Sequence, residues 1–100
     1  MEADMTMCAA VLQRLCDGFG KDDQVSRRVA CLTLCESQES YNRVLERLAA
    51  QFLLDIVYVP NRTTGKEMLF PVIHYGTVKL VRASTPENVL QSNVSPLRRQ

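Results

Sequence analysis

Apolar side chains recur every three or four residues between Glu36 and Leu54, and this spacing predicts an amphipathic helix around which the chain is organised. The apolar positions of one face are Tyr41, Val44, Leu45, Leu48, Ala49 and Phe52. The charged residues of the other face are Glu39, Arg43, Glu46 and Arg47. Ser37 is placed to cap the first turn, because its hydroxyl can accept a hydrogen bond from a free backbone N–H.

A second helical pattern covers residues 4–19. Its apolar stripe consists of Met5, Cys8, Leu12, Leu15, Cys16 and Phe19. Gly18 and Gly20 supply the left-handed residue with which helices commonly end. Asp22 and Asp23 follow at once, and acidic residues favour a new helix start.

The segment from Val25 to Cys35 fits two structures. As a helix, it places Val25, Val29 and Leu32 on one face and turns Arg27 and Arg28 toward solvent. As a strand, residues 29–35 form a short apolar run that is buried on both sides. The glycine stop and acidic start before the segment favour the helix.

Beyond the central helix the pattern becomes that of strands. Leu54 to Val59 is rich in β-branched residues, residues 60–66 form a loop, and Glu67 to His74 is a partner strand. Pro71 lacks an N–H, so the second strand is expected at an edge or at a bulge. A turn at Tyr75-Gly76 leads into a third strand, Thr77 to Ala83, in which Val78 and Leu80 alternate with Lys79.

These elements predict an α+β fold of three helices followed by a three-stranded antiparallel β-meander, a winged-helix-like arrangement. The 100 residues are enough for one domain with a modest core, which we place at residues 1–83. Residues 84–100 contain two prolines and several polar residues and are expected to form a flexible C-terminal tail. If residues 29–35 are a strand, the alternative fold is a ferredoxin-like α/β sandwich.

Composition narrows the functional classes. The formal net charge of +1 gives no global attraction to nucleic acid, so such a role would need a local patch. The longest apolar run is too short to cross a membrane. Glu2 and Asp4 precede the apolar residues 5–12 where a signal peptide carries basic residues, so we expect a cytoplasmic protein.

The residues that usually carry chemistry do not form a recognisable set. Four cysteines, Cys8, Cys16, Cys31 and Cys35, lie among apolar neighbours, and their spacing is unlike that of zinc knuckles, so reduced thiols without metal are expected. His74 is the only histidine, and no nucleophile, base and orienting group can be assembled around it. We therefore expect neither an enzyme nor a cofactor.

The residues from Ser37 to Leu48 resemble the recognition helix of catabolite-activator-type winged helix-turn-helix regulators. The shared pattern is a capping Ser37, a polar residue, Glu39, Ser40, an apolar residue, then Arg43 and a leucine pair. Ala30 occupies the small position of the preceding helix, and Leu53-Leu54 lies where the family enters its wing. The resemblance covers about residues 22–75, and the turn that it places at residues 33–36 contains no glycine.

The resemblance implies a small non-enzymatic regulator that binds double-stranded DNA. Gln38, Glu39 and Arg43 would reach base edges in the major groove, and Asn42 belongs to the same DNA-binding set. Ser37, Ser40 and Arg47 would contact phosphates. Arg62 and Lys66, in the loop between the first two strands, would be the contacts of the wing.

A different class of function fits the same elements. The chain would then be a protein-interaction module, such as an adaptor, a chaperone or an inhibitor, that docks a partner through its sheet edge or an apolar helix face. In either case we expect a homodimer, because the first helix is rich in Met, Cys and Ala and a domain of this size has little else to cover it.

Overall fold

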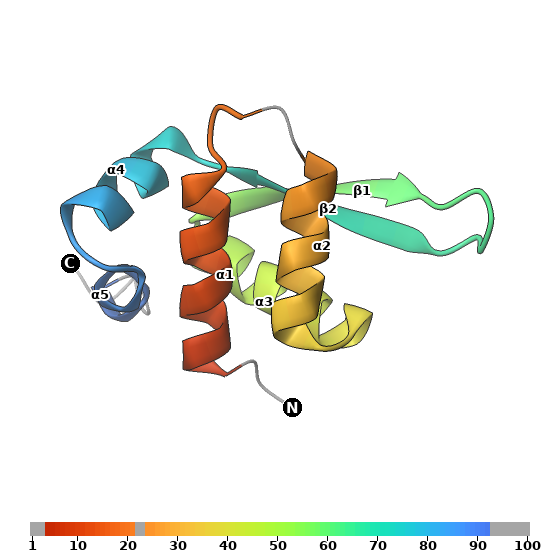
Figure 1. Ribbon diagram of the computed structural model, residues 1–100, viewed down its shortest axis with the longest axis horizontal. Helices are drawn as coiled ribbons and strands as arrows, with labels where there is room; N and C mark the ends of the chain where they lie inside the picture. The colour runs from red at the N-terminus through yellow and green to blue at the C-terminus, as the bar shows by residue number, and fades with distance from the viewer. Residues whose placement is uncertain (1–3, 22–23, 93–100) are drawn as a thin grey trace.

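Five helices and one two-stranded antiparallel sheet make up the fold in the computed structural model, which describes residues 4–21 and 24–92. In chain order the elements are α1 (Met5–Asp17), α2 (Gln24–Cys35), α3 (Gln38–Ala50), β1 (Leu54–Pro60), β2 (Glu67–Ile73), α4 (Tyr75–Ala83) and α5 (Pro86–Ser92). Helix α1 lies in the middle and contacts all four other helices. The β-hairpin extends from one end of the molecule, and α4 and α5 form the other end (Figure 1).

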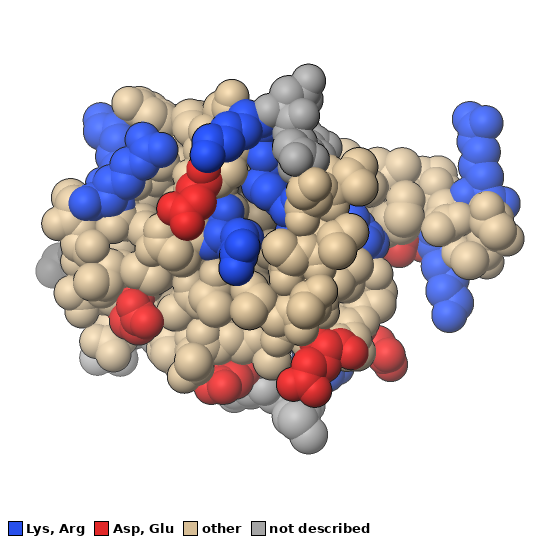
Figure 2. Space-filling model, viewed as in Figure 1, with Lys and Arg blue, Asp and Glu red and all other residues tan. Residues whose placement is uncertain are grey.

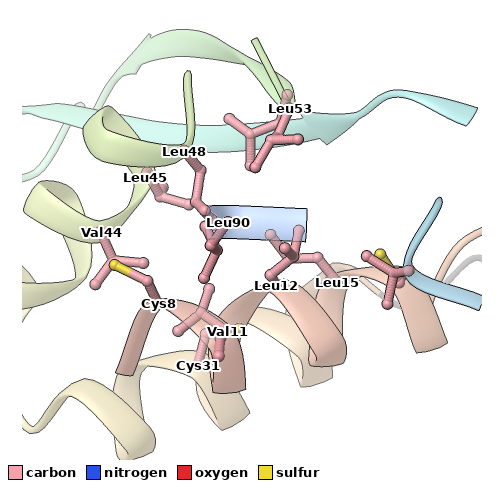
Figure 3. Packing of buried hydrophobic residues seen from close by; sticks show 14 of the residues in the cluster. Cys8, Val11, Leu12, Leu15, Cys31, Val44, Leu45, Leu48, Leu53 and Leu90 are labelled. Carbon is pink, nitrogen blue, oxygen red and sulfur yellow. The ribbon is translucent and has the colours of Figure 1, made fainter. Parts of the chain in front are cut away.

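The core is built where α1, α3 and α5 meet. Leucines from all three helices are fully buried there, and Figure 3 shows Leu90 of α5 among Val11 and Leu12 of α1 and Leu48 of α3. The face predicted for the central helix is confirmed for Tyr41, Val44, Leu45 and Leu48, which are all buried. The predicted cap is confirmed as well, because the Ser37 hydroxyl accepts a hydrogen bond from the Ser40 N–H at 3.1 Å.

Phe52 does not join this buried face, although the sequence pattern places it there. Helix α3 ends at Ala50, and Phe52 adopts the left-handed backbone conformation with a φ of 62°. That turn reverses the chain into β1 and breaks the helical phase. The Phe52 side chain is therefore 71% exposed, whereas the next two residues, Leu53 and Leu54, are buried.

The hairpin agrees with the sequence prediction in extent and in pairing. Leu54 lies opposite Ile73, Val57 opposite Phe70, and Pro60 opposite Glu67. Pro71 lies opposite Ile56, and since the sheet has two strands each of them is an edge strand, as expected for a strand with an internal proline.

The predicted third strand is wrong, and with it the three-stranded meander. Residues 75–83 form helix α4, so the segment read as a turn at Tyr75-Gly76 begins a helix. Thr77, Val78 and Val81 are the buried residues of α4, a helical spacing, whereas Leu80 is exposed. The Thr77 hydroxyl donates to the Leu53 carbonyl oxygen at 2.7 Å and ties α4 to the start of the hairpin.

The boundary of the folded domain also differs from the expectation. Residues 86–92, which the sequence analysis assigns to a tail, form helix α5 against α1. Val89 and Leu90 contribute to the core. The remainder of the expected tail, residues 93–100, lies outside the described residues.

Helix α2 confirms the helical prediction for residues 25–35, which removes the ferredoxin-like alternative. Its predicted orientation is wrong, because Val25 and Val29 are 76% and 57% exposed whereas Arg27 and Arg28 are half-buried. Arg27 donates from Nη1 to the carbonyl oxygens of Gly18 and Lys21, at 2.8 and 2.9 Å. The guanidinium thus binds backbone carbonyl oxygens of the loop that follows α1, and the Gly18 oxygen also accepts from the Lys21 N–H at 3.0 Å. The helix start expected at Asp22-Asp23 lies outside the described residues.

Gly18 leaves room for the Arg27 side chain, because a Cβ atom at position 18 would collide with it and the arginine would have to move. Close approach of the backbone to Arg27, rather than a positive φ, favours glycine here. Within residues 4–21 and 24–92, every helix is too short or too polar to cross a lipid bilayer.

Alkaline pH is expected to destabilise the fold through its buried thiols. Burial raises the pKa of Cys16 and of Cys35 to about 11, whereas the pKa of an exposed thiol is about 8.5. Between these values the unfolded chain loses protons that the folded chain keeps, so stability falls as the pH rises through the window and is unaffected below it. Urea midpoints measured from pH 7 to 10.5 should show this fall, and a Cys16→Ala variant should show a shallower one. A midpoint that is constant up to pH 10.5 would contradict the prediction.

Candidate nucleic-acid interface

Helices α2 and α3 are joined by a turn of two residues. Glu36 adopts the left-handed conformation, with a φ of 67°, and Ser37 is extended and caps α3. The turn therefore forms without a glycine, because Glu36 itself takes the conformation that glycine adopts most readily. The result is a pair of consecutive helices with a two-residue connection that leads directly into the β-hairpin.

A groove runs between the exposed side of α3 and the distal part of the hairpin. Its volume is about 590 Å³. Its lining residues come from α2, α3, β2 and the hairpin loop and are Arg28, Gln38, Glu39, Asn42, Asn61, Thr64, Lys66, Glu67 and Met68. Two cations and two carboxylates line it, so its formal charges cancel. The groove is therefore polar without a net formal charge.

Among the described residues that line the groove, Arg28 is the one that comes from α2, and it is half-buried. Its guanidinium lies 5.9 Å from the ring centre of Tyr41 and 5.6 Å from that of Phe70, within the range of cation–π attraction. Arg28 Nη2 donates to Gln38 Oε1 at 2.9 Å, and Gln38 Nε2 donates to Asn42 Oδ1 at 2.8 Å. One arginine therefore connects α2, the exposed polar side of α3 and strand β2.

The hairpin tip is a hydrogen-bonded turn built on Asn61. Asn61 Oδ1 accepts from the backbone N–H groups of Thr63 and Thr64, at 2.9 and 3.2 Å. The Gly65 N–H donates to the Asn61 carbonyl oxygen at 2.7 Å, and Gly65 takes a positive φ of 76°. This turn presents Arg62 and Lys66 as exposed side chains, and Figure 2 shows basic side chains at the projecting tip.

The structure brings four of the nine predicted DNA-binding residues into this groove: Gln38, Glu39, Asn42 and Lys66. Arg43 and Arg62 are exposed but do not line it. Ser37 and Ser40 form the cap of α3. Arg47 is half-buried on another side of α3, where its charge partly offsets the effect of burial on the pKa of the Cys8 thiol.

Sequence reasoning missed five residues of the groove: Arg28, Asn61, Thr64, Glu67 and Met68. Asn61 carries a recognisable signal. An asparagine at the start of a loop commonly closes a turn, because its side-chain oxygen accepts from the backbone N–H two residues further on. Arg28 could not be found in this way, because the helical pattern placed it in solvent. Its aromatic neighbours come from α3 and β2, which are distant in the sequence.

His74 lies apart from the groove. It occupies the N-cap position of α4 rather than a strand, and its Nε2 lies 2.9 Å from Asp55 Oδ2. Among the residues that the structure describes, no three His, Cys, Asp or Glu side chains are grouped so that they could hold a metal ion. Comparison with known protein families, curated proteins and solved structures finds no match for this chain.

Proposed function

We propose that this protein binds double-stranded DNA, with α3 in the major groove and the hairpin tip against the backbone. The observation that carries the proposal is the groove that joins the polar N-terminal half of α3 to the hairpin loop. Protein helices fit the major groove, and basic loop residues are suited to phosphate contacts. A regulator of transcription in the cytoplasm is the role that fits this activity.

The affinity is expected to be modest and moderately salt-dependent. The exposed cations available on these two elements are Arg43, Arg62 and Lys66. If Arg62 and Lys66 each neutralise one phosphate of B-DNA while Arg43 contacts a base edge, the logarithm of the binding constant should fall with a slope of about −1.8 against the logarithm of salt concentration. The acidic Glu39 and Glu67 in the groove keep the slope from being steeper.

Fluorescence anisotropy with a labelled random-sequence duplex, measured at several salt concentrations, tests the proposal. We expect binding at low salt that weakens as salt is added. The labelled duplex without protein is the control for signal drift. An unstructured trilysine, which carries as many cations as Arg43, Arg62 and Lys66 together, is the control for simple ion exchange. Absence of binding at low salt, with the protein shown to be folded by circular dichroism, would refute the proposal.

A second candidate function is protein binding, and a specific observation favours it. The inward orientation of Arg27 and Arg28 leaves Val25 and Val29 exposed on the outer side of α2. Val57, Tyr58 and Val72 are similarly exposed on the hairpin, each by about half (46%, 53% and 49%). Exposed apolar groups on an edge strand favour docking of another chain. If duplex DNA does not bind, this adaptor function is the one to pursue.

The homodimer remains a proposal, with a different physical basis. Helix α1 is covered by the other helices within the chain, so it does not supply the uncovered surface expected from its sequence. The exposed valines of α2 are the surface that a second copy would cover. Light scattering at tens of micromolar should give twice the chain mass, and Val25→Ser with Val29→Ser should return it to that of one chain. A monomer mass for the unchanged protein would contradict the proposal.

A further inference from the structure

The hydrogen-bond chain from Arg28 through Gln38 to Asn42 has a fixed direction. A guanidinium has only donors, so the Gln38 atom that faces Arg28 must be the amide oxygen, as the 2.9 Å contact shows. The Gln38 NH₂ group is thereby turned toward Asn42. Its 2.8 Å partner there must again be the acceptor, Oδ1. The arginine thus determines the orientation of both amides, and the Asn42 NH₂ group is left to donate into the groove.

The position of Arg28 favours this direction of the hydrogen bonds. Its guanidinium is held near the rings of Tyr41 and Phe70, which come from α3 and β2. Tyr41 is completely buried, so the α3 side of this arrangement belongs to the core. Rotation of either amide would replace a good hydrogen bond by two facing donors.

The outward-facing groups therefore match one base pair better than the other. Adenine presents an acceptor, N7, beside a donor, the N6 amino group, and an amide reads it with one free oxygen and one free NH₂. Here both amide oxygens already accept a bond. Guanine presents two acceptors, N7 and O6, which suit the donor N–H groups of the Asn42 side chain. Its partner cytosine presents an amino donor, and Glu39 in the same groove offers a carboxylate that can accept from it.

We propose that the α3 groove selects G·C over A·T base pairs and that Arg28 is the positioning residue that sets this preference. The inference rests on the proposed DNA binding and specifies which duplexes are bound best. A carbonyl oxygen can accept a second hydrogen bond, so the network biases the choice rather than forbidding adenine. The expected preference is about tenfold, within the range measured for one well-formed contact to a base.

Selection from a randomised duplex library, followed by anisotropy on matched duplexes that differ by one G·C to A·T exchange, tests the inference. The unchanged protein should prefer G·C by about tenfold. Arg28→Met keeps an unbranched side chain near the two rings but removes the donor, and it should reduce the ratio to about twofold or less. Arg82→Met, on the exposed surface of α4, removes an equal charge and should leave the ratio unchanged.

Asn42→Asp provides a second variant that preserves the network, because the carboxylate still accepts from Gln38 while the outward donor is lost. It should abolish the preference for guanine even if binding to all duplexes weakens. Binding without a G·C preference in the unchanged protein, or an undiminished preference in folded Arg28→Met or Asn42→Asp, would overturn the inference and leave the proposed function standing. Absence of binding to any duplex would overturn both.

Discussion

Replacing Leu90 with alanine is expected to lower the free energy of unfolding by about 2–5 kcal/mol. Leu90 is fully buried, although it lies in α5, close to the C-terminal end of the described residues. Figure 3 places it between side chains of α1 and α3, so truncation removes packing from both helices and leaves a cavity. Urea denaturation followed by circular dichroism measures the change.

Leu80→Ala is the matched control for this prediction. Leu80 lies in α4 and is 54% exposed, so the same substitution there should cost less than about 1 kcal/mol. A Leu90→Ala variant as stable as Leu80→Ala would mean that residues 86–92 contribute little to the fold. The core would then have to be attributed to α1 to α4 and the hairpin alone.

The parts of the fold that local patterns determine were predicted correctly. Helix α3 has a strong three-and-four periodicity and a capping Ser37, and the hairpin has β-branched strands around a loop with Gly65. The third strand was wrong because Val78 and Leu80 alternate with Lys79, a pattern that nine helical residues can also show by chance. The helix is favoured by a tertiary contact that the local pattern does not contain. Thr77 is buried, and its hydroxyl donates to the Leu53 carbonyl oxygen.

The orientation of α2 could not be predicted from its own sequence. Hydrophobic patterning assigns valines inward and arginines outward. The fold reverses this assignment because Arg27 finds two backbone oxygens at the end of α1 and Arg28 finds two aromatic rings. An arginine with a long apolar stem can occupy such a half-buried position when its charged end has partners.

The residues that line the groove could be anticipated only in part from the sequence. Gln38, Glu39 and Asn42 could be identified from the exposed face of α3, and Lys66 from the loop. Arg28, which contacts α3 and β2 from α2, appears only once the three elements are placed together. The pattern of α3 and the loop thus predicts side chains that line the groove, but it does not predict the arginine that contacts them from α2.

Arg43→Ala and the pair Arg62→Ala with Lys66→Ala are expected to change DNA binding in different ways. Arg43 is exposed on α3, where it can reach base edges, so its loss should cost about 1–3 kcal/mol on a preferred site and relax the sequence preference. The hairpin pair lies on a loop suited to phosphates. Its loss should weaken binding to all duplexes alike and make the salt slope shallower by about 1.8.

Lys79→Ala with Arg82→Ala is the matched control, because it removes two exposed charges from α4, at the end of the molecule opposite the hairpin tip (Figure 1). Equal effects of the two charge pairs would mean that binding follows net charge rather than the surface of α3 and the hairpin. If neither Arg43→Ala nor the hairpin pair alters binding, the DNA interface is refuted. The exposed valines of α2 and the hairpin would then become the surfaces to test for a protein partner.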